Sequence, residues 1–337
     1  MKLDCQDRIL LTGAGFTKNF GGPLAKELWS IIFSNRILDK APDVRDILRR
    51  DFDFESVYND VIRGANLLQF DASKGAPTWE SQQRALRTAV NEAYEYIDEK
   101  IRSFSFRTGA PYPVNIYMVQ EFISKFAGTS NSSPGYFFTL NQDLFVERQY
   151  YNGRPPTLPG IQHRSSWFTT NGTQSLMAER CVIPDSAPKI DFSGSPFYYL
   201  KLHGSSNWYT ADQETMVIGH AKRTQIAAHP ILAAYFEAFQ SVLASGGRRL
   251  LCVGYGFSDE HINAAIRDGI KTDLRLYVLS PESPDGLAAR LRQQQETGEI
   301  IWQGLAGYFQ TDLKTLFPAD QSTTAEWKLL QGRFLAS

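Results

Sequence analysis

Cysteine is scarce in this sequence of 337 residues, which contains three cysteines, Cys5, Cys181 and Cys252. They lie far apart and form no Cys-x-x-Cys pair, so the sequence predicts neither a zinc ribbon nor a disulfide framework. Unpaired cysteines of this kind are typical of a reducing compartment, and we expect a cytoplasmic protein.

Long apolar runs are also missing. No uninterrupted stretch reaches about 18 apolar residues, the length needed to cross a bilayer. The first residues, MKLDCQDRILL, contain acidic side chains where a signal peptide would be apolar. We therefore expect no membrane association.

An excess of charge of one sign is absent as well. The chain has 35 basic and 36 acidic residues and a formal net charge of −1, so no overall positive field attracts nucleic acid. We expect no direct nucleic acid binding. Hydrophobic residues make up 42% of the chain, which is typical of a folded globular protein.

Short apolar segments alternate with helical patterns along most of the chain. Nearly continuous apolar strands of this kind are typical of a parallel sheet that is buried on both faces. We predict an α/β fold with a Rossmann-like parallel sheet, helices on both faces and no zinc ribbon. The predicted arrangement is a single domain with a core of residues 1–34 and 131–320, a helical insertion at 35–130 and an irregular insertion at 152–196.

Four of the predicted strands end in polar or glycine-rich clusters, which read TGAGFT, TLNQD, KLHGSSNW and GYGFSDEHIN. Ligands of open parallel sheets bind outside the carboxyl ends of the strands. Because all four clusters should open on the same edge, we expect a ligand site there.

The GAGFT cluster has the form of a phosphate-binding turn. Gly13 and Gly15 would let the backbone approach a phosphate at the start of the following helix. The dinucleotide fingerprint needs a third glycine where this chain has Lys18, and no acidic residue follows at the usual distance of about 20 residues. A plain Rossmann dehydrogenase is therefore not indicated, and a tight turn without a ligand is the alternative.

The TLNQD cluster places Asn141 and Asp143 on the same side of an extended segment. An amide and a carboxylate together can bind a carboxamide or ribose hydroxyls. Alternatively, Asn141 ends the strand and Asp143 caps the helix that follows.

His203 lies at the predicted ligand edge and is the best candidate for proton transfer near neutral pH. A structural, hydrogen-bonded histidine is the alternative. The other histidines have no metal-ligand spacing, and His261 in SDEHIN reads as structural beside a helix cap at Ser258 or Asp259. We predict no metal site.

In this order, the motifs GAGFTKNFGGP, TLNQD, KLHGS and VGYGFSDEHIN resemble the sirtuin-like (silent information regulator two) superfamily, and most of all its bacterial anti-phage branch, which hydrolyses NAD. The resemblance implies NAD⁺ as a substrate, no metal, and Asn141 and His203 as the catalytic residues. It implies NAD-binding roles for Gly13, Ala14, Gly15, Phe16, Thr17, Asp143, Gly254, Tyr255 and Ser280.

The chain also departs from protein-deacylating sirtuins. It lacks their zinc-binding cysteines, and after GGP it continues with Leu24-Ala25-Lys26 where they have Asp-Phe-Arg. We therefore expect an NAD⁺ glycohydrolase (NADase) that depletes NAD⁺ in anti-phage defence by abortive infection. The alternatives are a sensor module that binds NAD or ADP-ribose, and a deacylase or ADP-ribosyltransferase.

The resemblance also implies partners. Effectors of this branch form homo-oligomers and pair with a second protein such as a HerA-like ATPase or a short Argonaute. We expect the helical insertion at 35–130 or another surface to carry these contacts.

Overall fold

The computed structural model describes residues 6–63, 78–104, 111–150, 156–161, 181–183, 190–210 and 215–336. Most of the predicted irregular insertion at 152–196 lies outside the described residues. Within the described part of the chain, no helix is long and apolar enough to span a membrane.

The centre of the molecule is a sheet of six parallel strands in the order β4-β2-β1-β6-β7-β8. The chain builds the sheet outward from β1 through β2 to β4, returns to place β6 beside β1, and continues to β8 on the other side. The topological switch point therefore lies between β1 and β6. The strands are β1 (Arg8–Thr12), β2 (Gly135–Thr139), β4 (Phe197–Lys201), β6 (Arg249–Val253), β7 (Arg275–Ser280) and β8 (Leu305–Gln310). A separate pair of short parallel strands consists of β3 (Cys181–Val182) and β5 (Trp208–Tyr209).

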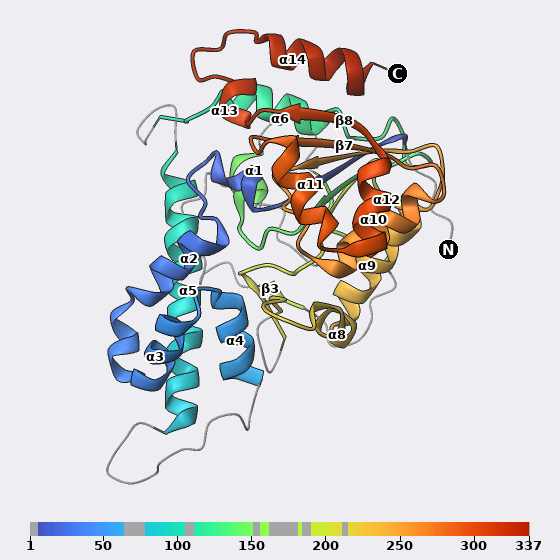
Figure 1. Ribbon diagram of the computed structural model, residues 1–337. Helices are drawn as coiled ribbons and strands as arrows, with labels where there is room; N and C mark the ends of the chain where they lie inside the picture. Colours follow the sequence, from blue (N-terminus) through green and yellow to red (C-terminus); the bar gives the residue numbers. More distant parts are fainter. Residues whose placement is uncertain are drawn as a thin grey trace.

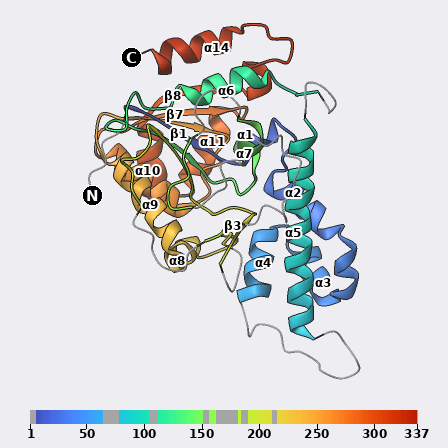
Figure 2. The same cartoon turned by 180° about the vertical axis from the view of Figure 1, so that it is seen from behind.

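Helices cover both faces of the sheet, as predicted from the apolar strands (Figure 1). In both views α6 and α14 lie on one side of β7 and β8, and α8 and α9 lie on the other (Figure 2). The helices of the core are α1 (Ala14–Lys18), α6 (Ile116–Ser124), α7 (Phe145–Gln149), α8 (Lys222–Ala228), α9 (Pro230–Leu243), α10 (Glu260–Ile270), α11 (Pro284–Arg292), α12 (Gln295–Gln303), α13 (Leu313–Leu316), α14 (Ala325–Leu330) and the terminal turn Gln331–Leu335.

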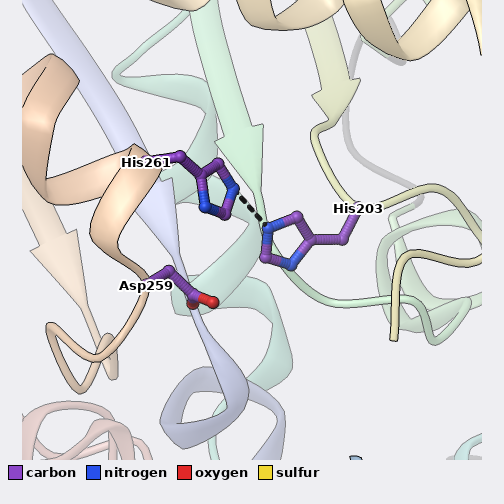
Figure 3. A group of neighbouring side chains, drawn as sticks. All are labelled: His203, Asp259 and His261. Atoms are coloured by element: carbon purple, nitrogen blue, oxygen red, sulfur yellow. Dashed lines mark hydrogen bonds between the residues drawn. The ribbon is translucent and has the colours of Figure 1, made fainter. Parts of the chain in front are cut away.

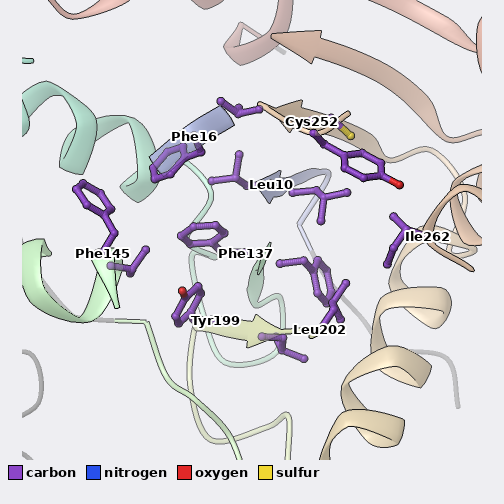
Figure 4. Close-up of a cluster of buried hydrophobic side chains, with 14 of the residues drawn as sticks. Leu10, Phe16, Phe137, Phe145, Tyr199, Leu202, Cys252 and Ile262 are labelled. Carbon is purple, nitrogen blue, oxygen red and sulfur yellow. The ribbon is translucent and has the colours of Figure 1, made fainter. Parts of the chain in front are cut away.

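The register of the strands explains why both faces are apolar. Leu10 pairs with Phe137, which pairs with Tyr199, and this row packs on Phe16 and Phe145 on one face (Figure 4). The next residue of each strand points to the opposite face, because side chains alternate along a strand. All of these side chains are at most 3% exposed, which is why the strands are nearly continuous apolar runs.

Four helices, α2 (Ala25–Phe33), α3 (Pro42–Arg50), α4 (Phe54–Arg63) and α5 (Trp79–Ser103), and the 3₁₀ turn Arg36–Lys40 form a helical lobe beside the sheet (Figure 1). α5 begins at Thr78, whose side chain caps the helix by accepting a hydrogen bond from the Ser81 N–H. A buried ion pair at 2.9 Å joins Asp98 of α5 to Arg148 of α7, and both side chains are at most 3% exposed. The lobe is therefore fixed to the segment that follows β2.

Candidate active site

The carboxyl ends of the central strands are level with one another. Thr12 pairs with Thr139 and with Val253, and Thr139 pairs with Lys201. The residues that follow these positions therefore meet at one edge, as the four polar clusters predict. They open into a cavity of about 910 Å³, whose lining includes the predicted site residues Gly13, Ala14, Gly15, Asn141, His203, Gly254, Tyr255 and Ser280.

The glycines of the GAGFT turn bring the ends of β1 and β6 into contact. The Gly13 N–H donates to the Val253 carbonyl at 3.1 Å, and the Gly15 N–H donates to the Gly254 carbonyl at 2.9 Å. A Cβ on Gly15 would lie 2.7 Å from the Gly254 Cα, and Gly254 itself has a φ of +64°. The glycines therefore do more than let a phosphate approach: they close the floor of the cavity at the switch point, and the Gly15 N–H is used within the protein.

Asn141 holds this turn in place from the neighbouring strand. Its side-chain amide nitrogen donates to the Gly13 carbonyl at 3.0 Å and to Thr17 Oγ1 at 2.7 Å. These two bonds use both amide hydrogens and leave the amide oxygen, Oδ1, as the atom that can contact a ligand.

Asp143 stands one layer behind Asn141. Its Oδ2 accepts a hydrogen bond from Thr17 Oγ1 at 2.9 Å, and its Oδ1 accepts one from the Phe145 N–H at 2.9 Å. Asp143 therefore accepts a hydrogen bond from Phe145, the first residue of α7, whose N-cap is Leu144, and it also supports the turn. Burial raises the pKa of Asp143, and the charge of Lys201 opposes this shift.

Three of the predicted NAD-binding residues lie behind the large cavity. Thr17 and Asp143 line a small adjoining cavity of about 110 Å³. The ring of Phe16 points into the core, where it packs on Phe20 and Phe145. The structure therefore places these three as supports of the wall.

His203 and His261 form a pair that the spacing in sequence did not reveal. Their Nε2 atoms lie 3.0 Å apart, although the residues are 58 positions apart in the chain (Figure 3). His203 follows β4 and is 4% exposed, and His261 lies in the first turn of α10. His261, which the sequence analysis regarded as structural, is therefore in direct contact with the predicted catalytic histidine.

Both imidazoles are neutral at pH 7. Burial lowers the pKa of His203 to about 3, and the positive charge of Lys222 adds to this effect. Burial also lowers the pKa of His261 to about 4, with Asp259 opposing the shift. Because a neutral imidazole has one N–H and one bare nitrogen, a single hydrogen lies between the two Nε2 atoms.

A chain of charges lies beside the histidine pair. Lys222 Nζ is 2.8 Å from a carboxylate oxygen of Asp259 and 2.8 Å from one of Glu55. The chain joins α8 and the start of α10 to α4 of the helical lobe. These three residues line both the large cavity and a second cavity of about 550 Å³, whose lining also includes His220, Arg223 and His261.

His203, Asp259 and His261 also have the composition of a metal site. Among the residues that the structure describes, they are the group whose candidate ligand atoms come together, all within 4.8 Å of one another. The ammonium group of Lys222 already lies 2.8 Å from the Asp259 carboxylate, where it competes with a cation for the same oxygens. We therefore assign no metal to this group.

Other contributors to the site were also missed from the sequence. Tyr94 of α5 donates a hydrogen bond to Gln142 Oε1, and the Gln142 amide donates to the Val217 carbonyl at 2.8 Å and the His203 carbonyl at 3.3 Å. Gln142 was visible as the fourth residue of TLNQD, but its partners come from distant segments. Local patterns carry no signal for them.

A doubly wound parallel sheet with a glycine-lined cavity at its switch point is typical of nucleotide-binding α/β proteins. Residues 136–301 match the family model of the SIR2-like domain. This match supports membership of the SIR2-like superfamily, as the motifs indicate, and an NAD-related function at the family level. The match includes TLNQD, KLHGS and GYGFSDEHIN, whereas GAGFT lies before it. A search of curated proteins found no match.

Proposed function

We propose that the protein is an NAD⁺ glycohydrolase, which cleaves the bond between nicotinamide and ribose and releases nicotinamide and ADP-ribose. The observation that carries this proposal is the position of His203. It is a buried, neutral histidine that lines a 910 Å³ cavity at the switch point, and Asn141 lines the same cavity.

The lining of the cavity suits the parts of NAD⁺. Lys26 and Arg50 line the cavity from the helical lobe and can attract the diphosphate, which carries negative charge. Ser280, the last residue of β7, and Glu282, which follows β7, also line the cavity and offer oxygen atoms for ribose hydroxyls. In this arrangement the nicotinamide ribose lies near Asn141 and His203.

The chemistry needs few groups from the protein. Nicotinamide leaves as a neutral molecule when the bond between its ring nitrogen and the ribose C1′ breaks, because the electron pair of that bond neutralises the pyridinium. The ribose passes through an oxocarbenium-like state, and a water adds to C1′. In our proposal, Asn141 Oδ1 orients the water or a ribose hydroxyl, and the neutral His203 accepts the proton that the water loses.

We further propose that this activity depletes NAD⁺ during phage infection and that the chain acts as a homo-oligomer with a defence partner. The resemblance to the anti-phage branch supports this setting. Light scattering after size exclusion, showing only monomer at micromolar concentration, would count against the oligomer.

The direct test is chromatography of NAD⁺ incubated with the wild type, His203→Ala, Asn141→Ala and the control His220→Ala. His220 is bonded to Ser56 at 3.2 Å and lies outside the large cavity. We expect nicotinamide and ADP-ribose with the wild type and the control, and a loss of about 10²–10⁴-fold with the other two variants. If NAD⁺ stays intact in every sample but still binds to the protein, the result would favour a sensor module over an enzyme. ADP-ribose attached to an acceptor protein would indicate transferase chemistry, and the loss of an acyl group from an acceptor protein would indicate deacylase chemistry.

A further inference from the structure

Hydrolysis of NAD⁺ leaves one proton over. Water supplies the hydroxyl that bonds to C1′, nicotinamide leaves without needing a proton, and the second hydrogen of the water is released as H⁺. The proposed function therefore requires a route by which this proton leaves the site.

His203 is poorly placed to release the proton directly. Its side chain is 4% exposed, and burial disfavours its charged form, which is why the pKa of His203 is lowered to about 3. A proton taken up by His203 needs a second acceptor nearby. His261 Nε2, at 3.0 Å from His203 Nε2, is such an acceptor.

His261 connects the buried histidine to a different space. It lines the second cavity of about 550 Å³ and is absent from the lining of the large one, whereas His203 lines the large cavity and is absent from the lining of the second. The two rings therefore form a bridge between the cavities, and Figure 3 shows them meeting through their Nε2 atoms.

We propose that His261 is the second member of a proton relay that carries the reaction proton from His203 into the second cavity. His203 Nδ1 takes the proton from the attacking water, and the hydrogen on His203 Nε2 passes to His261 Nε2. His261 then releases its Nδ1 hydrogen to solvent in the second cavity. The proposal rests on the NAD⁺ glycohydrolase function, in which His261 is a positioning and relay residue because it acts through His203.

Asp259 and Lys222 act on both rings of the pair: Asp259 favours the imidazolium form of His203 and of His261, and Lys222 disfavours both. Arg223 of α8 also disfavours the imidazolium form of His261. Glu55 of α4 neutralises Lys222 from the far side, at 2.8 Å. Because His261 is less deeply buried than His203, it holds a proton more readily, and its pKa of about 4 means that it still releases the proton at neutral pH.

Chemical rescue tests the relay. We expect His261→Ala to lower kcat about tenfold or more while KM for NAD⁺ stays within about twofold, because the lost step follows binding. Added imidazole should enter the second cavity and restore the rate, in step with the fraction of imidazole that is unprotonated. His203→Ala should not be rescued, since that position is buried.

Matched variants separate a relay from a structural role. His220→Ala removes another histidine of the same cavity and should leave kcat unchanged. His261→Gln keeps most of the side-chain volume, so it should fold, lose activity and resist rescue. Wild-type kcat and pH profile in His261→Ala would overturn the relay. So would an activity loss that imidazole does not restore, or a wild-type activity that a chelator abolishes and zinc restores.

A measurement without catalysis distinguishes failure of the relay from failure of the proposed function. Histidine ring signals followed by NMR should show that His203→Gln raises the pKa of His261, because a buried neighbour that shares its hydrogen is removed. If the wild type does not hydrolyse NAD⁺, the proposed function fails while this coupling is still measured. An unchanged His261 titration would overturn the relay by itself.

Discussion

The cavity has two walls that are built on different principles. On one side, Asn141, Thr17 and Asp143 form a network in which each hydrogen bond has a fixed donor and acceptor. On the other, His203 and His261 share one hydrogen that either Nε2 can carry. The first wall fixes geometry, and the second can move a proton.

The supports behind the two walls differ in the same way. Behind Asp143, Lys201 and Glu147 form an ion pair at 3.0 Å that is at most 3% exposed, so the charges are held in a dry interior. Beside the histidines, Lys222 is 18% exposed and is shared between two carboxylates that line open cavities. A site that must hold a substrate rigidly and also release a proton needs both kinds of wall.

The largest expected effect is on the rate of NAD⁺ hydrolysis, and the dependence of that rate on pH should differ between variants of the two walls. Asn141→Ala and His203→Gln should both lower the rate of NAD⁺ hydrolysis, by about 10²–10⁴-fold. The residual rate of Asn141→Ala should keep the wild-type pH profile, because its proton acceptors remain, whereas the profile of His203→Gln should flatten. Stopped assays of nicotinamide release from pH 3 to 7 measure both, because this range includes the pKa values of His203 and His261 at about 3 and about 4. Identical profiles in the two variants would remove the distinction between the walls.

Glu147→Ala tests the buried ion pair between Lys201 and Glu147 that lies behind Asp143. It leaves the Lys201 ammonium group buried without its partner, which should lower the free energy of unfolding by about 3–5 kcal/mol. The matched control is Glu121→Ala, which breaks an exposed ion pair with Lys125 and should cost less than about 1 kcal/mol. Urea unfolding followed by circular dichroism measures both. A loss in Glu147→Ala as small as in the control would show that the pair does not support the wall.

The fold and the positioning wall were largely visible in the sequence. Apolar runs that end in polar clusters indicate parallel strands, and the order of the motifs indicates the family. Asn141, His203 and the GAGFT turn follow from local patterns, because each lies immediately after a strand and strand ends share an edge.

The proton-handling wall was not visible, for a physical reason. The contact between His203 and His261 depends on the angle at which α10 leaves β6 and on the packing of α8, which brings Lys222 to Asp259. We expected the glycines of GAGFT to make room for a phosphate, whereas their tightest contact in the structure is with Gly254. Interactions between side chains from separate segments leave no periodicity or spacing that a single sequence can show.

Thr17→Val tests the hydroxyl at the centre of the positioning wall. The substitution keeps the shape but removes the donor to Asp143 and the acceptor for Asn141, so we expect a loss of about 1–3 kcal/mol in unfolding free energy. Thr17→Ser keeps the hydroxyl and serves as the control. Thermal unfolding of both variants checks this, and equal stability of Thr17→Val and the wild type would contradict the network.

A last prediction concerns the dependence of the stability on pH. The pKa values of His203 and His261 are lowered to about 3 and about 4 in the folded state, whereas an unfolded histidine has a pKa of about 6.5. Between about pH 6.5 and pH 4 the unfolded chain therefore binds more protons than the folded one, so stability rises with pH in this window and falls as the pH is lowered. Each histidine contributes up to about 1.4 kcal/mol per pH unit. Urea unfolding at pH 7 and pH 5 should show a larger loss for the wild type than for His203→Gln combined with His261→Gln, and the carboxylates common to both proteins cancel. Equal losses would show that burial does not lower the pKa values of the two histidines. The basis for a relay between a buried and a less buried histidine would then be lost.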